Sequence, residues 1–239
     1  MDYCDLTLPT PEENLACDEA LLDLCEEGHG QELLRLWQPA QYFVVLGYAN
    51  NIATEANLAF CRQNKIPVLR RWTGGGAVLQ GPGVLNYALI LRADSSGQCH
   101  TITAANNFIL KRQQAALSDL LQKRVEKQGH TDLAISGLKF CGHGQRRKKQ
   151  FLLFHGSFLL SLDLSLIEKA LRMPSRQPDY RHGRSHSEFL MNLEIPAEKL
   201  KAALLRAWNA TAPLAKIPSD RIRALIQQKY SQHEWNFKF

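Results

Sequence analysis

The spacing of apolar residues along the chain switches repeatedly between a helical and a strand period. A period near 3.6 predicts an amphipathic helix. It recurs over residues 11–27, 54–64, 101–124, 196–209 and 219–230. In the first of these segments Pro11 suits the first helical turn, while Glu12 and Glu13 suit the positive end of the helix dipole.

Between the helical segments lie short runs rich in β-branched and aromatic residues, which predict strands. They are Leu33–Trp37, Tyr42–Gly47, Val68–Trp72, Leu85–Leu91, Leu133–Ile135, Lys139–Cys141 and Leu152–Asp163. The mixed order of strands and helices favours an α/β or α+β domain over a helix bundle or a β-sandwich. No repeat and no Pro/Gly/Ser-rich linker divides the chain, so we expect residues 1–239 to form a single domain.

Composition narrows the class of protein. Apolar residues make up 45% of the chain and charged residues 22%, which is ordinary for a globular protein. No apolar run approaches the ~18–20 residues of a membrane span, and the first residues lack the basic and apolar regions of a signal peptide. The six cysteines are spaced widely, without a zinc pattern. Reduced thiols and a cytoplasmic protein without membrane association are therefore expected.

The net charge of +6 is compatible with acidic small molecules, acidic proteins or nucleic acid as partners. The densest basic run is Arg146–Lys149, and such a run is usually a solvated turn. It lacks the interleaved aromatic residues of single-strand binders, so nucleic acid is not expected as a partner. Residues Arg147–Lys149 are instead candidates for steering an acidic protein domain.

Residues 70–86 form a glycine-rich segment, in which Gly74–Gly76 directly follow a predicted strand. Such a run is typical of a backbone that closely approaches a ligand, and its successive N–H groups can form an anion nest. Arg70 and Arg71 add forked donors for phosphate or carboxylate. The segment matches neither the Walker A nor the GxGxxG pattern, and a plain hairpin turn is the alternative.

Lys139 lies early in a predicted strand that follows the Ser136–Gly137 turn signal. A half-buried lysine keeps its charge where an anion or a carbonyl meets it, which suits polarising an acyl carbonyl or neutralising phosphate. The alternative is an exposed lysine on an edge strand. Further on, His155 alone is more often a core histidine, whereas Gly156 within a strand indicates close approach of a ligand or another backbone.

Together these segments resemble the biotin/lipoate protein ligase family, and within it the branch of lipoate–protein ligases of A type and octanoyltransferases. The matching motifs follow the family's order: Asn14-x-Ala16-x-Asp18-Glu19-Ala20-Leu21-Leu22, Arg35-Leu36-Trp37, Val44–Gly47, Arg70-Arg71-x-Thr73-Gly74-Gly75-Gly76-Ala77-Val78, Gly83-x-Leu85-Asn86-Tyr87, Asp132-Leu133, Gly137-x-Lys139-Phe140-x-Gly142-x-Gly144-Gln145-Arg146, His155-Gly156-Ser157, Lys229-Tyr230 and Glu234-Trp235-Asn236. The resemblance implies a mixed β-sheet flanked by helices, as in class II ligases, with the acyl chain in a tunnel.

The resemblance also implies roles for individual residues. Lys139 would be catalytic and would contact the acyl carbonyl and the phosphate. Asn86 and Asp132 would lie on the nucleotide side, with Asp132 towards Mg²⁺, and His155 and Gly156 would line the acyl pocket. The residues assigned to the substrate or adenylate are Arg70, Thr73, Gly74, Gly75, Gly76, Ala77, Val78, Asn86, Asp132, Gly142, Arg146, His155 and Gly156.

The branch contains two chemistries. Ligases use ATP to form lipoyl-AMP, whereas octanoyltransferases take octanoyl from acyl carrier protein through a cysteine. The stretch Lys123–Asp132, where one transferase branch carries this cysteine, has none, and Cys141 is the last cysteine of the chain. Strand alternation would place Cys141 on the same face as Lys139, which keeps it open as a nucleophile. The resemblance favours a ligase with ATP and Mg²⁺ as cofactors and lipoate as substrate.

The implied partners are lipoyl acceptor domains, either of 2-oxoacid dehydrogenase acyltransferase subunits or the glycine-cleavage H protein. The chain stops at Phe239, without the C-terminal accessory domain of larger ligases. It would then need a separate accessory protein, accept pre-formed lipoyl-AMP, or be a degenerate relative. His143 departs from the family's small residues and is either a local adaptation or a base near the acceptor amine. The alternatives are an octanoyltransferase, a biotin ligase, or a non-catalytic protein that binds acyl-nucleotides or nucleic acid.

Overall fold

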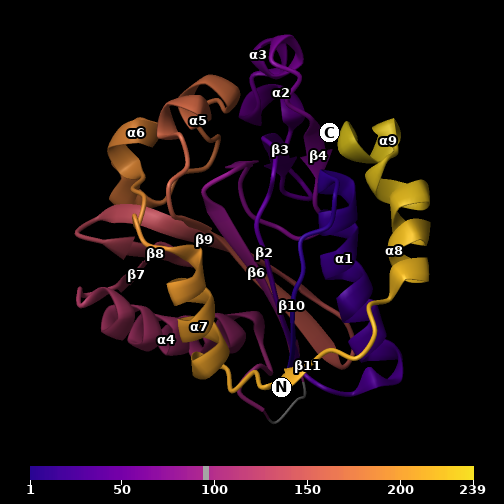
Figure 1. The fold of residues 1–239 in the computed structure, drawn as a ribbon. Coiled ribbons are helices and arrows are strands. Elements are labelled where there is room, and N and C mark those ends of the chain that lie inside the picture. Colours follow the sequence, from indigo (N-terminus) through magenta and orange to yellow (C-terminus); the bar gives the residue numbers. More distant parts are fainter. Residues whose placement is uncertain (94–96) are drawn as a thin grey trace.

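A large mixed sheet runs through the centre of the molecule (Figure 1), which a computed structural model describes for residues 1–93 and 97–239. The strand order is β11-β1-β2-β6-β10-β9-β8-β7. These strands are β1 (Asp2–Asp5), β2 (Leu33–Trp37), β6 (Val84–Arg92), β7 (Glu126–Gln128), β8 (Asp132–Ile135), β9 (Leu138–Arg147), β10 (Phe151–Leu159) and β11 (Ala212–Pro213). Strand β1 pairs in parallel with both neighbours, and the remaining pairs are antiparallel.

Helices cover both faces of this sheet (Figure 1). On one side, α4 (Ile102–Leu121) and α7 (Ala197–Ala207) pack over Leu34, Leu36, Leu89 and Phe154; we call this the α4 face. On the other side, α1 (Pro11–Leu24) and α8 (Ser219–Leu225) pack over Leu33, Ala88, Ile90 and Leu153; this is the α1 face. The fold class expected from the sequence, a mixed sheet flanked by helices, is confirmed.

A small sheet stands beside the large one and carries the glycine-rich segment. Its order is β4 (Val68–Arg70), β3 (Phe43–Leu46) and β5 (Val78–Gln80), with Gly74–Gly76 in the connection from β4 to β5. Its core is completed by α2 (Ile52–Glu55), α3 (Leu58–Gln63) and α5 (Leu164–Ala170). The remaining short elements are the single helical turns Cys25–His29, Asp179–Arg181 and Ile226–Tyr230, and helices α6 (His186–Phe189) and α9 (His233–Asn236).

The predicted helices agree best with the structure where the helical spacing of apolar residues continues over many residues. Helix α1 begins at Pro11, capped by Thr10 in a capping box with Glu13. The segment 101–124 ends earlier than expected, because Gln122 adopts a left-handed conformation with φ of 50°. The segment 54–64 is divided into α2 and α3 by Ala56 and Asn57, and the Asn57 side chain caps the second of these helices.

Several elements were not expected from the sequence. They are the short strands β1, β5, β7 and β11 and the helices α5, α6 and α9. The predicted strand Leu152–Asp163 ends at Leu159, and Asp163 instead caps α5 by accepting a hydrogen bond from the Ser165 N–H at 3.0 Å. None of the described helices is both long and apolar enough to cross a membrane.

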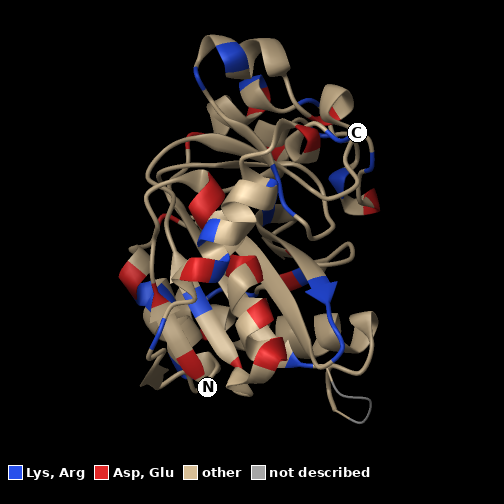
Figure 2. Ribbon diagram, turned by 90° about the vertical axis from the view of Figure 1, so that its right-hand side faces the viewer, with Lys and Arg blue, Asp and Glu red and all other residues tan. Residues whose placement is uncertain are grey.

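The basic run Arg146–Lys149 is only in part the solvated turn that its composition indicates: Arg146 and Lys149 are exposed, and Lys148 and Lys149 lie in the turn between β9 and β10. Arg147 ends β9 and donates to the carbonyls of Cys99 and His100, at 2.7 and 3.2 Å. Lys148 forms an ion pair with Asp23 of α1. Figure 2 shows acidic and basic residues interspersed on this side of the molecule. Here Asp23 of α1 also pairs with Arg221, and Glu19 pairs with Lys229. Two of the cations expected to steer a partner are therefore engaged within the fold.

Candidate active site

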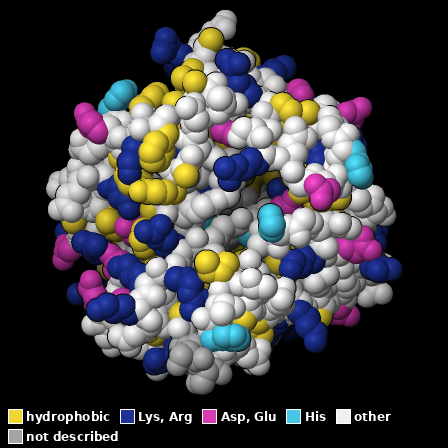
Figure 3. Space-filling model, turned by 180° about the vertical axis from the view of Figure 1, so that it is seen from behind, with side chains coloured by type: hydrophobic (Ala, Val, Ile, Leu, Met, Phe, Trp, Pro, Cys, Tyr) yellow, Lys and Arg dark blue, Asp and Glu magenta, His cyan; other side chains and the backbone are white. Residues whose placement is uncertain are grey.

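A cavity of about 850 Å³ lies where β8, β9 and β10 meet the small sheet. Figure 3 shows a hollow near the centre of one face of the molecule, with basic and histidine side chains around it. The predicted site residues that line the cavity are Gly75, Gly76, Ala77, Val78, Asn86, Asp132, Lys139, Gly142, His155 and Gly156. Arg70, Thr73, Gly74 and Arg146 are not among its lining residues. The cavity thus joins the glycine-rich segment to the lysine segment.

Lys139 reaches the cavity as a half-buried cation with one carboxylate partner. Its Nζ lies 2.8 Å from Oδ1 of Asp132, and the Tyr180 hydroxyl donates to Oδ2 of the same carboxylate at 2.8 Å. The Lys139 side chain is 26% exposed, so its ammonium is compensated yet accessible. When the ammonium moves to a ligand carbonyl or phosphate, the Asp132 carboxylate loses its ion pair but keeps the hydrogen bond from Tyr180.

Gly142 gives the Lys139 side chain its space. A Cβ added there would lie 2.9 Å from both Cε and Nζ of Lys139. We expect Gly142→Ala to fold normally, because only the flexible end of the lysine must move. Acyl transfer should fall about tenfold to a hundredfold, because the amine loses its position.

Steady-state transfer rates and thermal melting would test this prediction. Gly156→Ala is the comparison, because its Cβ would lie 2.4 Å from Cδ2 of His143 and 2.8 Å from Cε1 of Tyr87, where rigid rings have to shift. That variant should lose stability, whereas Gly142→Ala should lose activity alone. A Gly142→Ala enzyme with normal turnover would contradict the proposed positioning of Lys139.

A β-bulge at Phe140 separates Cys141 from the lysine. Lys139 pairs with Ala134 and Cys141 pairs with Leu133, so Phe140 is an extra residue in β9. Phe140, Cys141 and Leu133 all belong to the core of the α4 face. The expectation that Cys141 shares a face with Lys139 is therefore wrong, because the bulge breaks the alternation on which it rested.

His143 accompanies Cys141 on the α4 face. Its Nε2 lies 3.3 Å from Sγ of Cys141, its Nδ1 meets the carbonyl of Thr131, and its ring stacks on Phe154 with centroids 5.1 Å apart. Burial raises the pKa of the Cys141 thiol well above its usual range, and burial lowers the pKa of His143 to about 4. Both groups are therefore neutral at neutral pH. This packing favours a local adaptation of the core over a base at the acceptor amine.

The depressed pKa of His143 has a consequence for stability. The folded value of about 4 lies below the ordinary 6.5, so the unfolded chain binds more protons between these pH values. Stability should therefore fall as the pH is lowered through this window, by up to about 3 kcal/mol. The Thr131 carbonyl and the Asp132 carboxylate oppose this lowering of the pKa, and Lys139 adds to it.

Urea unfolding at a series of pH values would measure this dependence. His143→Gln removes the titrating group and keeps a polar side chain. The pH dependence between 6.5 and 4 should then become shallower than in the unmodified chain. An unchanged slope would show that His143 is not the group responsible.

Arg70 is used inside the fold. Its guanidinium donates to the backbone carbonyls of Gly47, Tyr48, Asn50 and Trp235, at distances of 3.0, 3.1, 2.8 and 3.2 Å. The side chain is fully buried. The geometry therefore shows a residue that ties β4 to the loop after β3 and to the C-terminal segment. The expected contact of Arg70 with phosphate stays a prediction, and Arg70 is not among the residues that line the cavity.

Arg71 is the arginine of this pair that lines the cavity. It donates to the carbonyls of Gly74 and Gly76, at 2.7 and 2.9 Å, and to Oγ1 of Thr73 at 3.0 Å. Burial lowers its pKa to about 10, so it remains a cation at neutral pH. Arg71 therefore shapes the glycine loop around the cavity. The sequence could not separate it from Arg70, because both flank the same glycines.

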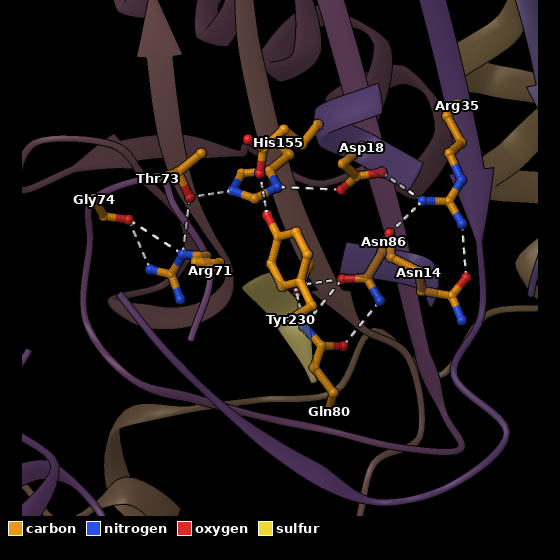
Figure 4. A network of polar contacts seen from close by, with 12 residues as sticks. Asn14, Asp18, Arg35, Arg71, Thr73, Gly74, Gln80, Asn86, His155 and Tyr230 are labelled. Carbon is orange, nitrogen blue, oxygen red and sulfur yellow. Dashed lines mark hydrogen bonds and ion pairs between the residues drawn. The ribbon is translucent and has the colours of Figure 1, made fainter. Parts of the chain in front are cut away.

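His155 lies in a buried polar chain on the α1 face (Figure 4). Its Nε2 lies 2.7 Å from Oγ1 of Thr73, and its Nδ1 lies 3.4 Å from Oδ2 of Asp18. The other Asp18 oxygen accepts from Arg35 at 2.6 Å. Thr73 in turn accepts from Arg71. This chain connects α1 and β2 to the glycine loop. Asp18 was part of the helix motif but was not named as a site residue.

Asn86 belongs to a second polar group in Figure 4. Its Nδ2 donates to Oε1 of Gln80 at 2.9 Å, and Gln80 donates to Oγ of Ser157 at 2.7 Å. Apolar walls for an acyl chain come from Leu15, Trp37, Val45, Val78 and Leu79, which line the same cavity. Arg146 lies outside it, over the ring of Trp72 at 5.1 Å from the centroid.

Asp132 is the one residue for which the sequence predicted a contact with a metal ion. Across residues 1–93 and 97–239, no three His, Cys, Asp or Glu side chains gather in a metal-binding group. Both oxygens of Asp132 are engaged, by Lys139 and by Tyr180. Mg²⁺ is commonly held by one or two carboxylates together with substrate phosphates, so the predicted role of Asp132 stays a prediction.

The model of the "Lipoyl protein ligase A/B catalytic domain" matches residues 10–208 of this chain. The chain belongs to the lipoyl protein ligase A/B family. Its function is therefore of the lipoate–protein ligase or octanoyltransferase type, and the resemblance seen in the motifs is confirmed.

Relatives within this family carry both kinds of name. The chain is 25% identical over 250 residues to "Lipoate-protein ligase A subunit 1" of Thermoplasma acidophilum, covering 97% of this chain and 95% of that protein. It is 26% identical over 265 residues to octanoyltransferase LipM of Geobacillus kaustophilus, covering 95% and 94%. The fold is similar to a crystal structure of lipoate-protein ligase A bound with ATP, with a TM-score of 0.86, 23% identity and coverage of 99% and 98%.

Proposed function

We propose that this chain is a single-domain, lipoate–protein ligase-like enzyme. It would form or use lipoyl-AMP and transfer the lipoyl or octanoyl group to a lysine of a lipoyl acceptor domain. The observation that carries the proposal is the position of Lys139 in the cavity beside Asp132, with Cys141 turned to the opposite face of the sheet. The lysine suits stabilisation of an acyl-transfer oxyanion, and the turned cysteine does not suit a thioester intermediate.

The chain's own residues account for binding and transfer. The apolar walls hold the acyl chain, and the glycine loop, braced by Arg71, presents backbone at the carboxylate end. Bound ATP would supply the adenylyl group, and Asp132 is the carboxylate that would hold Mg²⁺. As the acceptor amine attacks the acyl carbon, Lys139 leaves Asp132 and stabilises the developing oxyanion. The amide bond to the lysine nitrogen forms, the acyl–oxygen bond to the phosphate breaks, AMP leaves with the electron pair of that bond, and the nitrogen gives up its proton to solvent.

An octanoyltransferase is the second candidate, because several of the similar curated relatives are named octanoyltransferase LipM. That chemistry uses a cysteine as acyl carrier. Cys141 is the cysteine among the cavity-lining residues, and its pKa is raised well above the usual range by burial. A buried thiol in this state is a poor nucleophile, which favours the ligase.

The proposed partners follow from the relatives. One solved relative is described as "a bi-partite lipoate protein ligase and its E2 lipoyl domain" from Thermoplasma acidophilum, with 23% identity, a TM-score of 0.81 and coverage of 99% of this chain. By analogy, the acceptor here would be a lipoyl domain of a 2-oxoacid dehydrogenase acyltransferase or the glycine-cleavage H protein. A separate accessory protein would assist adenylation.

One assay separates the candidates. The purified chain is mixed with an apo acceptor domain and with lipoate plus MgATP, synthetic lipoyl-AMP, or octanoyl-carrier protein. A mass gain on the acceptor with lipoyl-AMP supports the ligase-type transfer, and a gain with MgATP as well shows that the chain makes its own adenylate. A gain with octanoyl-carrier protein alone would identify a transferase. No gain with any donor would overturn the proposed function.

A further inference from the structure

Cations and aromatic rings stack on one another at the surface beside the glycine-rich segment. We call this surface the cation–aromatic patch, and its members are Tyr48, Trp72, Arg146, Trp235 and Lys238. They come from the loop after β3, the loop after β4, the end of β9 and the C-terminal segment. Residues that lie far apart in the sequence therefore form one surface.

Arg146 and Lys238 give the patch its charge. The guanidinium carbon of Arg146 lies 5.1 Å from the ring centroid of Trp72 and 5.8 Å from that of Tyr48. The Nζ of Lys238 lies 4.8 Å from the Tyr48 centroid and donates to the Tyr48 hydroxyl at 3.0 Å. Both cations are exposed, so the patch presents positive charge to solvent.

Within residues 1–93 and 97–239, no Asp or Glu forms an ion pair with Arg146 or Lys238. The neighbouring Lys229 differs, because Glu19 of α1 pairs with it at 2.7 Å. The face of an aromatic ring stabilises an exposed cation only weakly. Two positive charges therefore remain available to the carboxylates of a partner.

The patch borders the cavity on the face of β9 that carries Lys139. Arg146 pairs with Leu153, a residue of the α1 face. Strand alternation places Gly142 and Gly144 on this same face, and both glycines line the cavity. A Cβ added at Gly142 would lie 2.9 Å from Nζ of Lys139. Arg146 follows roughly 13 Å further along the strand.

Nucleic acid and protein are the two classes of anionic partner to separate. Proteins that bind single-stranded nucleic acid stack the bases on aromatic rings. Here cations lie over the rings instead, with Arg146 and Lys229 over that of Trp72. This arrangement favours the carboxylates of a protein surface.

The proposed reaction indicates which protein would cover the patch. A lysine of the acceptor domain has to reach the acyl carbonyl beside Lys139, so that domain covers the mouth of the cavity. A domain of about 100 residues has a radius of gyration of about 13 Å. It therefore extends over the patch while its lysine enters the cavity.

We propose that the cation–aromatic patch is the docking surface for the acceptor domain, which presents carboxylates to Arg146 and Lys238 beside its target lysine. The patch takes the steering role that the sequence predicted for Arg147–Lys149, because Arg147 and Lys148 are engaged within the fold. Charges at the rim of an interface act chiefly on the rate of association. The inference deepens the proposed function and rests on it.

Stopped-flow association and steady-state transfer with the apo acceptor domain test the surface. We expect Lys238→Glu and Arg146→Glu each to lower the association rate about threefold to tenfold at low salt, and the double variant about tenfold to a hundredfold. The KM for the acceptor should rise by similar factors. The differences should fade at about 1 M salt, where the Debye length is about 3 Å.

Matched variants separate docking from other effects. Lys199→Glu makes the same change of charge at an exposed position of α7, over the α4 face, and should associate as the unmodified protein does. Lys238→Gln removes the charge without adding repulsion and should fall between the unmodified protein and Lys238→Glu. The affinity of Lys238→Glu for synthetic lipoyl-AMP, measured by calorimetry, should be unchanged, because Lys238 is not among the residues that line the cavity.

Three results would count against the proposal. If the unmodified chain transfers no acyl group to the acceptor domain, the proposed function fails and the docking surface with it. If transfer is normal and Lys238→Glu, Arg146→Glu and Lys199→Glu all associate at the same rate, the docking surface alone is overturned. It is also overturned, in favour of nucleic acid, if the double variant loses binding of a single-stranded oligonucleotide while its KM for the acceptor is unchanged.

Discussion

Replacing Lys139 with alanine is expected to lower acyl transfer by about a hundredfold to a thousandfold, the effect of removing a single oxyanion donor. The fold should persist. Asp132 loses an ion pair that is partly exposed, and it keeps the hydrogen bond from Tyr180, so the cost in stability should be about 1 kcal/mol. Single-turnover transfer from synthetic lipoyl-AMP would isolate the chemical step from adenylation.

Two comparisons sharpen the Lys139 experiment. Lys139→Arg keeps the charge but changes its geometry, and it should retain more activity than the alanine variant. Lys201→Ala removes a lysine that pairs with Asp5 on the far side of the chain and should transfer normally. An alanine variant of Lys139 with near-normal transfer would remove the basis of the proposed mechanism.

Replacing Arg35 with methionine is expected to destabilise the protein by about 3–5 kcal/mol, the cost of breaking a buried ion pair. Arg35 is fully buried. It donates to the Asp18 carboxylate at 2.6 Å and to Asn14 at 2.6 and 2.8 Å. Its loss leaves the Asp18 charge without its main partner. The melting temperature should fall by roughly 10 °C for a chain of this size.

Urea unfolding of the variants of a double-mutant cycle would test whether the unpaired Asp18 charge causes this loss of stability. Asp18→Asn in the Arg35→Met background removes the orphaned charge and should recover part of the loss. If Arg35→Met costs less than about 1 kcal/mol, the pair contributes little and the buried-charge argument fails. Because Asp18 also meets His155, the single variant should weaken binding of the acyl donor as well.

Much of the fold could be predicted from the sequence, because a regular spacing of apolar residues over a long segment indicates which face of a helix or strand is buried. The helices near residues 11–27, 101–124 and 196–209 and the central strands follow from such periods. Edge strands of two to four residues, such as β11 and β7, are too short to show a regular spacing of apolar residues. The predicted strand Leu152–Asp163 ran on to the residue that caps α5, and no element was predicted for α5 itself, because its seven residues are too few for a clear helical spacing of apolar residues.

The candidate site was predicted in part. Lys139, Asp132 and most of the glycine loop do meet in one cavity. Whether Arg70 or Arg71 lines the cavity depends on the direction of each side chain at the end of β4. No pattern in the sequence determines that direction.

The bulge at Phe140 also bears on redesign of the chemistry. A thioester enzyme needs a thiol facing Lys139. Cys141 contributes to the lining of the cavity, but its thiol packs beside His143 on the α4 face. Ser157 of β10 pairs with Gly142, lies on the α1 side with Asn86 and Gln80, and lines the cavity. An engineer seeking to convert this scaffold from one acyl donor to another should therefore install the thiol at position 157. Adjusting the cysteine already beside the lysine in sequence would leave the nucleophile on the wrong side of the sheet.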